Sequence, residues 1–407
     1  MRLVAVCLLS SSASGQELTL EEAFSRFLEL SPLVAAETEK MQIARGKLRQ
    51  AQAWANPVLN FSQEGYPVGL PENTFDDQEF LVWASQEFEI GGQRSKRRDL
   101  AQLELDAERA RHRDFLRRKR LELSQLFVRT YYISKKTQFL ERAMHGYSQI
   151  LETHRKRYEA GEVSGLAQMK IEAEELGYLV QLARAEREFK SAWNELSAMI
   201  VWKDAEMPKL NVDESAHLDL PDPLTLVSAA LKSRPDLESQ QLDSQAAEAA
   251  LEVEKAKNIP NLNLGGGYKR DFGQHSFFVG VQLPLPIWDR RQGALEQRLA
   301  TSRRQKMLNR WKEIWIRHEV ESTYGVYSRL LGASLRLDSD FVQKLDSIVQ
   351  ITALSYREGE AGILEFLDAL RTQRDTSLEQ IQLFEELHLA RMELEASVGI
   401  PLRNITP

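Results

Sequence analysis

The seven histidines of the chain are the residues best suited to catalysis or metal binding, but their spacing favours neither role. They are scattered, with no His-Glu-x-x-His motif and no pair at ligand spacing: His112, His145, His154, His217, His275, His318 and His388. The GGGY stretch at Gly265 lacks the Lys-Ser/Thr of a phosphate loop and lies in a predicted strand, where small residues allow a close bend. EVSG and SSASG lack the strand-to-helix setting of a nucleophile elbow. We therefore expect no enzyme, no metal site and no cofactor.

Two carboxylates offer a different kind of chemistry. Glu365 and Asp368 are three residues apart, which places both on one face of a helix. Such a pair can attract cations, although an ordinary solvated helix face would carry the same residues.

A short motif, Tyr-x-x-Gly-Glu, precedes these carboxylates and occurs twice. The copies YEAGEVSGLAQM and YREGEAGILEFL share an offset of 198 residues, from 158 to 356. Each copy interrupts a long helical pattern, so each predicts a sharp turn in which glycine accepts a positive φ. The motif residues are Tyr158, Gly161 and Glu162 in the first copy, and Tyr356, Gly359 and Glu360 in the second.

Long helices must position these turns. Two proline-free tracts, Pro71 to Pro208 and Pro286 to Pro401, are rich in Leu, Ala, Glu, Gln, Arg and Lys. Because these are strong helix formers, we predict one long helix over 93–157 and another over 289–355. At about 1.5 Å per residue each would be about 100 Å long, which no compact domain requires.

A pair of strands precedes each long helix. The predicted strands lie at about 57–66 and 79–90, and at about 260–270 and 276–285. Alternation is clearest in the last of them, where one face is apolar: Phe277, Val279, Val281 and Leu283. This pattern fits a strand with lipid on one side, and it also fits a soluble hairpin packed on helices.

The chain is a tandem duplication. The stretch from Ser31 matches the stretch from Arg234 at a constant offset of 203, with Pro57 on Pro260 and Asn60 on Asn263. The predicted organisation is a signal peptide at 1–15, a first structural repeat at 16–200 with a tip turn at 158–164, a linker at 201–220, a second repeat at 221–400 with a tip turn at 356–362, and a C-terminal tail at 401–407.

The N-terminus predicts export. Arg2 precedes an apolar core from Leu3 to Leu9, which is followed by small residues. The single cysteine, Cys7, lies inside that core, and the bulky Val6 before it disfavours lipidation, so we expect a mature chain without disulfides. No stretch of 18 apolar residues predicts a membrane-spanning helix, and the net charge of −7 disfavours a nucleic-acid partner.

This layout resembles the TolC family of outer-membrane efflux ducts over almost the whole mature chain. The resemblance implies a mainly α fold with a small β part. Each protomer would contribute four strands to a trimeric, twelve-stranded outer-membrane β-barrel and its helices to a periplasmic α-helical barrel. A homotrimer agrees with the strand count, because four strands cannot close a barrel and about eight are needed. The implied location is the outer membrane, in contact with its lipid, with an extension into the periplasm.

Two stretches narrow the resemblance. SQEFEIGGQRSKR at 85–97 and VQLPLPIWDRRQG at 281–293 are similar to strand-to-helix junctions in outer-membrane components of CzcC-type heavy-metal pumps. This implies the channel of a tripartite efflux pump that exports heavy-metal cations, with a periplasmic adaptor and an inner-membrane RND-type pump as partners. A duct for drug efflux or type I protein secretion is the alternative within the fold. A soluble periplasmic coiled-coil adaptor fits less well, because the strands occur only as hairpins.

The second turn resembles the tunnel entrance of that family. Tyr356, Glu365 and Asp368 match residues of its constriction, and three copies would bring six carboxylates together. The first turn is followed by Ala167 and Met169 instead, so it is expected to be an outer tip. The family's arginine in the second turn has no match at Ala361, so the resemblance does not transfer a salt-bridge lock. The residues expected to dock the adaptor are Tyr158, Gly161, Glu162, Gly359 and Glu360.

Overall fold

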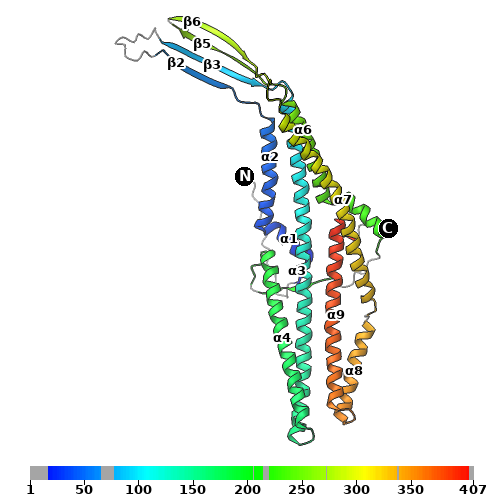
Figure 1. Cartoon of the computed structure of the whole chain (residues 1–407). Coiled ribbons are helices and arrows are strands. Elements are labelled where there is room, and N and C mark those ends of the chain that lie inside the picture. Colours follow the sequence, from blue (N-terminus) through cyan, green and yellow to red (C-terminus); the bar gives the residue numbers. More distant parts are fainter. Residues whose placement is uncertain are drawn as a thin grey trace. The chain divides into compact units, whose positions relative to one another are not determined.

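The computed structural model describes residues 17–65, 78–204, 206–213, 220–271, 273–336 and 339–402. The fold is mainly α with a small β part (Figure 1). The signal peptide predicted at 1–15 and residues 403–407 of the predicted tail lie outside the described residues. Among the described helices, none is both long and apolar enough to cross a membrane.

The two halves of the chain repeat one order of elements. The first half contains α1 (Leu20–Leu30), α2 (Pro32–Gln52), β2 (Val58–Glu64), β3 (Glu79–Phe88), α3 (Gln93–Glu159) and α4 (Gly165–Met199). The second half contains α5 (Pro223–Ser233), α6 (Pro235–Ala256), β5 (Leu262–Asp271), β6 (Gln274–Gln282), α7 (Gln292–Ser334), α8 (Ser339–Glu358) and α9 (Ile363–Val398). The first long helix, α3, is unbroken, whereas its counterpart is in two pieces.

The single helix expected over 289–355 is therefore wrong in the second half. α7 ends at Ser334, whose hydroxyl donates to the Leu331 carbonyl, and α8 begins at Ser339. The sequence here combines Gly332 with a run of Ser and Asp residues. Glycine weakens a helix interior, and Ser and Asp favour helix ends, so the local sequence favours an interruption that composition over the whole tract conceals.

The start of this helix also differs from the prediction. Residues 289–291 form a turn in which the Asp289 carboxylate accepts the Arg291 N–H at 2.8 Å. Arg291 has a positive φ of 58°, which is incompatible with a continuous right-handed helix. Helix α7 consequently begins at Gln292.

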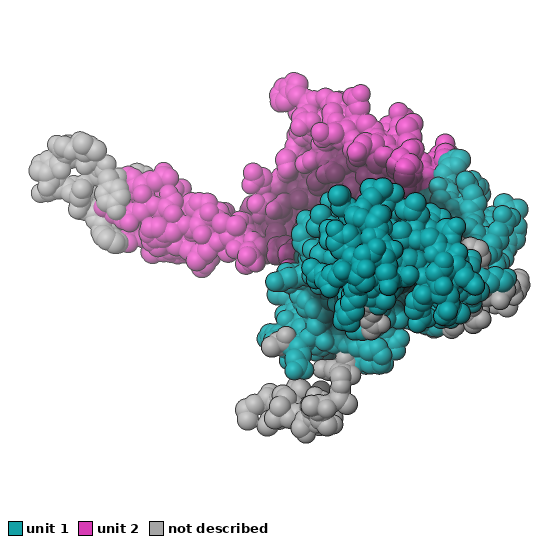
Figure 2. Space-filling model, turned by 90° about the horizontal axis from the view of Figure 1, so that it is seen from below, with its two compact units in different colours: residues 1–35, 115–233, 316–407 teal, residues 36–114, 234–315 magenta. Residues whose placement is uncertain are grey.

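The chain divides into two compact units, coloured in Figure 2. Unit 1 comprises residues 1–35, 115–233 and 316–407 and contains both tip turns. Unit 2 comprises residues 36–114 and 234–315 and contains the larger sheet.

Unit 1 has a core where four helical segments meet a short parallel strand pair. Phe27 of α1, Val34 of α2, Leu123 of α3 and Leu196 of α4 pack together in this core. The strands β1 (Glu17–Thr19) and β4 (Lys209–Asn211) pair beside it. They were not expected from the sequence, because three residues are too few to show an alternating pattern, and β4 falls within the predicted linker at 201–220.

Unit 2 contains a four-stranded antiparallel sheet in the order β2-β3-β5-β6. One row across the sheet joins Phe61, Val82, Tyr268 and Phe277, so the face predicted to be apolar on β6 continues across all four strands. This face is open: Phe277 and Val279 are each 87% exposed.

The opposite face of the sheet is largely polar. Lys269 lies on this face and forms ion pairs with Glu79 at 2.6 Å and with Asp271 at 3.1 Å. Gly267 of β5 lies on this face directly opposite Trp83 of β3, and a Cβ on Gly267 would lie 2.5 Å from the Cβ of Trp83. A side chain larger than hydrogen would force the two strands apart.

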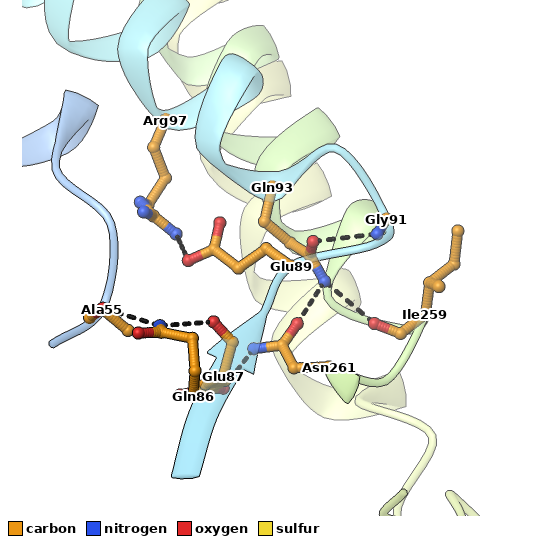
Figure 3. A network of polar contacts seen from close by, with 9 residues as sticks. All are labelled: Ala55, Gln86, Glu87, Glu89, Gly91, Gln93, Arg97, Ile259 and Asn261. Atoms are coloured by element: carbon orange, nitrogen blue, oxygen red, sulfur yellow. Dashed lines mark hydrogen bonds and ion pairs between the residues drawn. The ribbon is translucent and has the colours of Figure 1, made fainter. Parts of the chain in front are cut away.

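A polar network closes the junction between β3 and α3 (Figure 3). Gln93 is only 3% exposed, and its carboxamide oxygen accepts the Gly91 N–H at 3.1 Å. Its amide nitrogen donates to the Ile259 carbonyl at 2.9 Å and to the Asn261 side chain at 2.8 Å. One side chain therefore fixes the start of α3 and joins it to the segment that leads into β5.

Candidate entrance site

The two tip turns, at 158–164 and 356–362, have the same backbone conformation. Gly161 has a φ of 78° and Gly359 a φ of 79°, both in the left-handed region where glycine is favoured. The Gly161 N–H donates to the Tyr158 carbonyl at 2.9 Å, and the Gly359 N–H donates to the Tyr356 carbonyl at 3.2 Å. The repeated motif therefore reverses the chain in the same way twice, between α3 and α4 and between α8 and α9 (Figure 1).

The tyrosines of the two turns have different surroundings. Tyr158 is 44% exposed, whereas Tyr356 is only 7% exposed. The other residues expected to dock an adaptor are all exposed: Gly161, Glu162, Gly359 and Glu360. Tyr356, which was expected to line a constriction, is buried inside unit 1 of the single chain.

Tyr356 is the centre of an aromatic stack. Its ring lies nearly parallel to His154 of α3, with centroids 6.3 Å apart, and to Phe366 of α9, with centroids 5.8 Å apart. The Arg157 guanidinium lies 5.4 Å from the ring centroid and donates to the Tyr356 carbonyl at 3.3 Å. The stack therefore connects the two tip turns through α3, α8 and α9.

Burial shifts the pKa of both titratable rings in this stack. It raises the pKa of Tyr356, although the nearby Arg157 opposes the shift. It lowers the pKa of His154, and the positive charge of Arg157 acts in the same direction. His154 is thus held neutral to a lower pH than a free imidazole.

The two carboxylates are exposed at the start of α9, Glu365 on its first turn and Asp368 on its second. Glu365 also accepts the Gly362 N–H at 3.3 Å, so it caps the start of the helix in addition to presenting charge. Both carboxylates line a groove of about 420 Å³ between α8 and α9. Its other walls include Ile348 and Ile351, which are exposed, so the groove is acidic at one side and apolar at the other.

A cluster further along α9 was not expected from the sequence. Arg371 and Arg374 both bind the carboxylate of Glu174 on α4, with nitrogen-to-oxygen distances between 2.6 and 2.8 Å. Glu174 is buried, and Arg374 lies 5.0 Å from the ring centroid of Tyr178. Tyr178 stacks on Tyr147 of α3 at 5.4 Å. The cluster therefore fastens α9 to both helices of the first tip turn.

The charges in this cluster shift the pKa values of its members. The hydrogen bonds with Glu174 raise the pKa of Arg371, and Asp368 adds to that shift. Burial raises the pKa of Tyr178 against the opposing charge of Arg374. Helix α9 therefore presents acidic residues at the turn and basic residues, tied to Glu174, about one helical turn further on.

No short motif signals this cluster. Glu174 is separated from Arg371 by 197 residues, and its counterpart in the second repeat, at the offset of 198, is Thr372. The sequence offers one indication of the cluster: Arg371 and Arg374 are three residues apart, so they lie on the same face of α9. Among the described residues, no group of three or more His, Cys, Asp or Glu side chains is arranged to hold a metal ion.

Comparison with known families gives one match over most of the chain. The family model described as outer membrane efflux protein matches residues 23–200 and 226–400. These two segments coincide with the two halves of the duplication.

Curated relatives and solved structures agree with this match. The chain is 21% identical to the cobalt-zinc-cadmium resistance protein CzcC of Cupriavidus metallidurans, over 94% of this chain and 90% of that protein. It is 23% identical to the nickel and cobalt resistance protein CnrC of the same organism, over 66% of this chain and 63% of that protein. The fold matches the open state of the MtrE outer membrane channel of Neisseria gonorrhoeae with a TM-score of 0.78 and 17% identity, over 95% of this chain and 91% of that chain.

Proposed function

We propose, from the premise that the chain belongs to the outer membrane efflux protein family, that three copies form a passive duct through which heavy-metal cations leave the cell. As a member of that family, the chain is an outer-membrane protein that extends into the periplasm. The trimer, the cargo and the partners are the proposed parts.

The four-stranded sheet is the observation that carries the proposal. Its apolar face is exposed at Phe277 and Val279 in the single chain, and such a face is stable against lipid. Its outer strands, β2 and β6, each pair with one neighbour within the described chain. Since about eight strands are the minimum for a closed barrel, the sheet needs further copies, and three copies supply twelve strands.

The acidic groove supports a cationic cargo. Three copies of Glu365 and Asp368 would place six carboxylates around one entrance, where pairs about 8 Å apart in water repel by about 0.5 kcal/mol each. Cations would relieve that repulsion. The relatives whose names describe resistance to cobalt, zinc, cadmium and nickel favour metal cations over drugs or proteins as the cargo.

The proposed partners follow from the passive nature of a duct and from the residues that the tips expose. A duct has no energy source of its own, so an inner-membrane RND-type pump would drive transport. A periplasmic adaptor would dock on the exposed tips, where the chain presents Tyr158, Gly161, Glu162, Gly359 and Glu360.

A growth assay tests the cargo directly. A strain lacking the protein should lose resistance to cobalt, zinc, cadmium or nickel and should keep its resistance to hydrophobic drugs. The wild-type chain should restore metal resistance, and the double variant Glu365→Ala/Asp368→Ala should restore it less well. The exposed Glu379→Ala on the same helix is the matched control and should restore it fully. Loss of drug resistance alone would overturn the metal assignment.

A further inference from the structure

At the junction between β3 and α3, Gln93 binds the segment of the same chain that leads into β5. We infer that the junction between β6 and α7 binds the corresponding segment of a second copy of the chain. In the second copy, the main-chain carbonyl of Asn56 would accept the amide of Gln292, and β2 would pair with β6 in a defined register. The inference rests on the proposed homotrimer and adds its contacts.

The two hairpins fix the correspondence between the halves. Asn60 of β2 corresponds to Asn263 of β5 at the offset of 203. Asn60 pairs with Trp83, and Asn263 pairs with Gln282, so β3 corresponds to β6 at an offset of 199, from 83 to 282. The register of the sheet sets this offset without reference to the junctions.

The two junctions give the same offset independently. Gly92 and Arg291 both have a positive φ, of 72° and 58°, and 92 to 291 is again 199. The Gly91 N–H donates to the Gln93 side-chain oxygen at 3.1 Å, and the Arg290 N–H donates to the Gln292 side-chain oxygen at 3.0 Å. The same local turn is therefore built twice.

The two junctions differ in what their glutamine amides bind. The amide of Gln93 is buried against the Ile259 carbonyl and the Asn261 side chain (Figure 3). Gln292 is exposed, and within the described part of the chain its amide nitrogen has no hydrogen-bond acceptor. The junction between β6 and α7 therefore has the same turn as the junction between β3 and α3, but no chain segment is bound to its glutamine amide in the described structure.

The duplication identifies the missing segment. Ile259 corresponds to Asn56 at the offset of 203, so a second copy would offer the Asn56 carbonyl to Gln292. Asn261 corresponds to Val58, which has no side-chain acceptor, so one of the two hydrogen bonds of Gln93 is expected to recur.

The same correspondence sets the register between copies. Trp83 pairs with Gly267 within the chain, so Gln282 is expected to pair with Glu64 of the second copy. Beyond Gln282, where β6 ends, the odd-numbered positions continue the apolar row in the sequence and are exposed: Leu283, Leu285 and Ile287. This row would continue the lipid-facing surface once β6 is extended by the second copy.

The prolines of this segment are placed to permit that pairing. In the two-residue hairpin that joins Asp271 to Gln274, the even-numbered residues of β6 direct their N–H groups toward β5. Pro284 and Pro286 are even-numbered, so they remove donors only on the side that β5 has already left. Leu283 and Leu285 keep donors for the outer edge, whereas the Ile287 N–H donates to the Leu285 carbonyl at 2.9 Å, so the pairing would end before Ile287.

The correspondence between the contact within the chain and the inferred contact between copies does not extend to the helices that follow the junctions. Arg111 of α3 forms an ion pair with Asp243 of α6, but the corresponding residues are Arg310 and Lys40, which repel. Arg290 also stands where Gly91 allows close approach, so the second copy must lie slightly further away. The inferred contact is therefore confined to the junction and the strands.

Cysteine pairs test the register. Within one chain, Gln282 and Glu64 are three strands apart, which is about 14 Å at about 4.8 Å per strand, and they also lie at opposite ends of the sheet, so they are too far apart for a disulfide. In a Cys7→Ser background, Gln282→Cys with Glu64→Cys should give covalent trimers on non-reducing gels. Gln282→Cys with Ser62→Cys shifts the register by two residues and should link weakly, because diagonal neighbours lie about 7–8 Å apart. Stronger linking of the shifted pair, or no linking of either pair in an intact oligomer, would overturn the inferred register.

The inferred hydrogen bond from Gln292 to the Asn56 carbonyl of the second copy is tested by a variant that leaves the strands unchanged. Gln292→Ala should lower the temperature at which the detergent-purified oligomer dissociates, while Gln297→Ala, on the same helix, should leave it unchanged. Equal dissociation temperatures for both variants would refute the role of Gln292. A chain that is monomeric in every variant, including the wild type, would instead refute the proposed trimer.

Discussion

Substitution of Glu174 by glutamine should loosen the contact between α4 and α9 beside the second tip turn. The carboxylate of Glu174 is buried and binds two arginines, Arg371 and Arg374, through three contacts of 2.6 to 2.8 Å. Glutamine keeps the size of the side chain and one acceptor oxygen but removes the negative charge. The arginines would then face each other without an acid between them.

The expected magnitude follows from the exposure of each partner. Arg374 is largely buried, and a hydrogen bond to a charged group is worth about 1.5–3 kcal/mol in that setting. The Arg371 side chain is half-exposed, so its pair contributes at most about 1 kcal/mol. We expect the substitution to reduce the free energy of local opening by about 2 kcal/mol, which is about 30-fold in an equilibrium constant.

Hydrogen exchange of the detergent-purified protein measures this opening. Amides at 165–180 and 363–376 should exchange about 30-fold faster in Glu174→Gln, and amides of the larger sheet should be unchanged. The exposed Glu172→Gln, on the same helix, should have no effect. The double variant Glu174→Gln/Arg374→Gln should cost less than the sum of the single variants, because the interaction is already lost. Unchanged exchange near the tips, or additive effects, would refute the assignment of Glu174 as the fastener.

Three further predictions concern the tips. Because the folded tip lowers the pKa of His154 below its ordinary value of 6.5, tip stability should be constant above about pH 6.5 and should fall as the pH decreases below it; His154→Phe should abolish that dependence in hydrogen exchange corrected for intrinsic rates. Gly359→Ala should destabilise the second tip turn by about 1–2 kcal/mol, because its φ is 79°, whereas Gly177→Ala within α4 should stabilise the helix slightly; equal effects in thermal unfolding would contradict the turn argument. Glu365→Ala/Asp368→Ala should weaken block by divalent cations in single-channel recordings, and unchanged block would remove these carboxylates from the entrance.

The sequence predicts the features that occur in both halves, because a pattern found at the same offset in each half supports the same structural interpretation twice. The offset of 198 between the two tip motifs corresponds to two turns with the same positive φ at Gly161 and Gly359. The alternation that includes Phe277 and Val279 corresponds to an exposed apolar face. These features depend on local backbone preferences and on strand periodicity, which a single sequence records.

The sequence does not predict features that arise where unlike helices meet. Tyr158 and Tyr356 occupy the same motif, yet only Tyr356 is buried, because His154 and Phe366 flank it. The Glu174 cluster is missed for the same reason, since its members lie on helices far apart in the chain. The interruption between α7 and α8 was missed because average composition outweighed the local effect of Gly332.

The number of chains in the detergent-purified particle is the most direct test of the duct, because four strands per chain cannot enclose a pore alone. Light scattering coupled to size-exclusion chromatography measures that number after the detergent mass is subtracted. The proposed duct predicts three chains per particle in the fraction extracted from outer membranes, and dissociation to single chains on heating. A stable single chain at every protein concentration, recovered from the soluble periplasm, would contradict it.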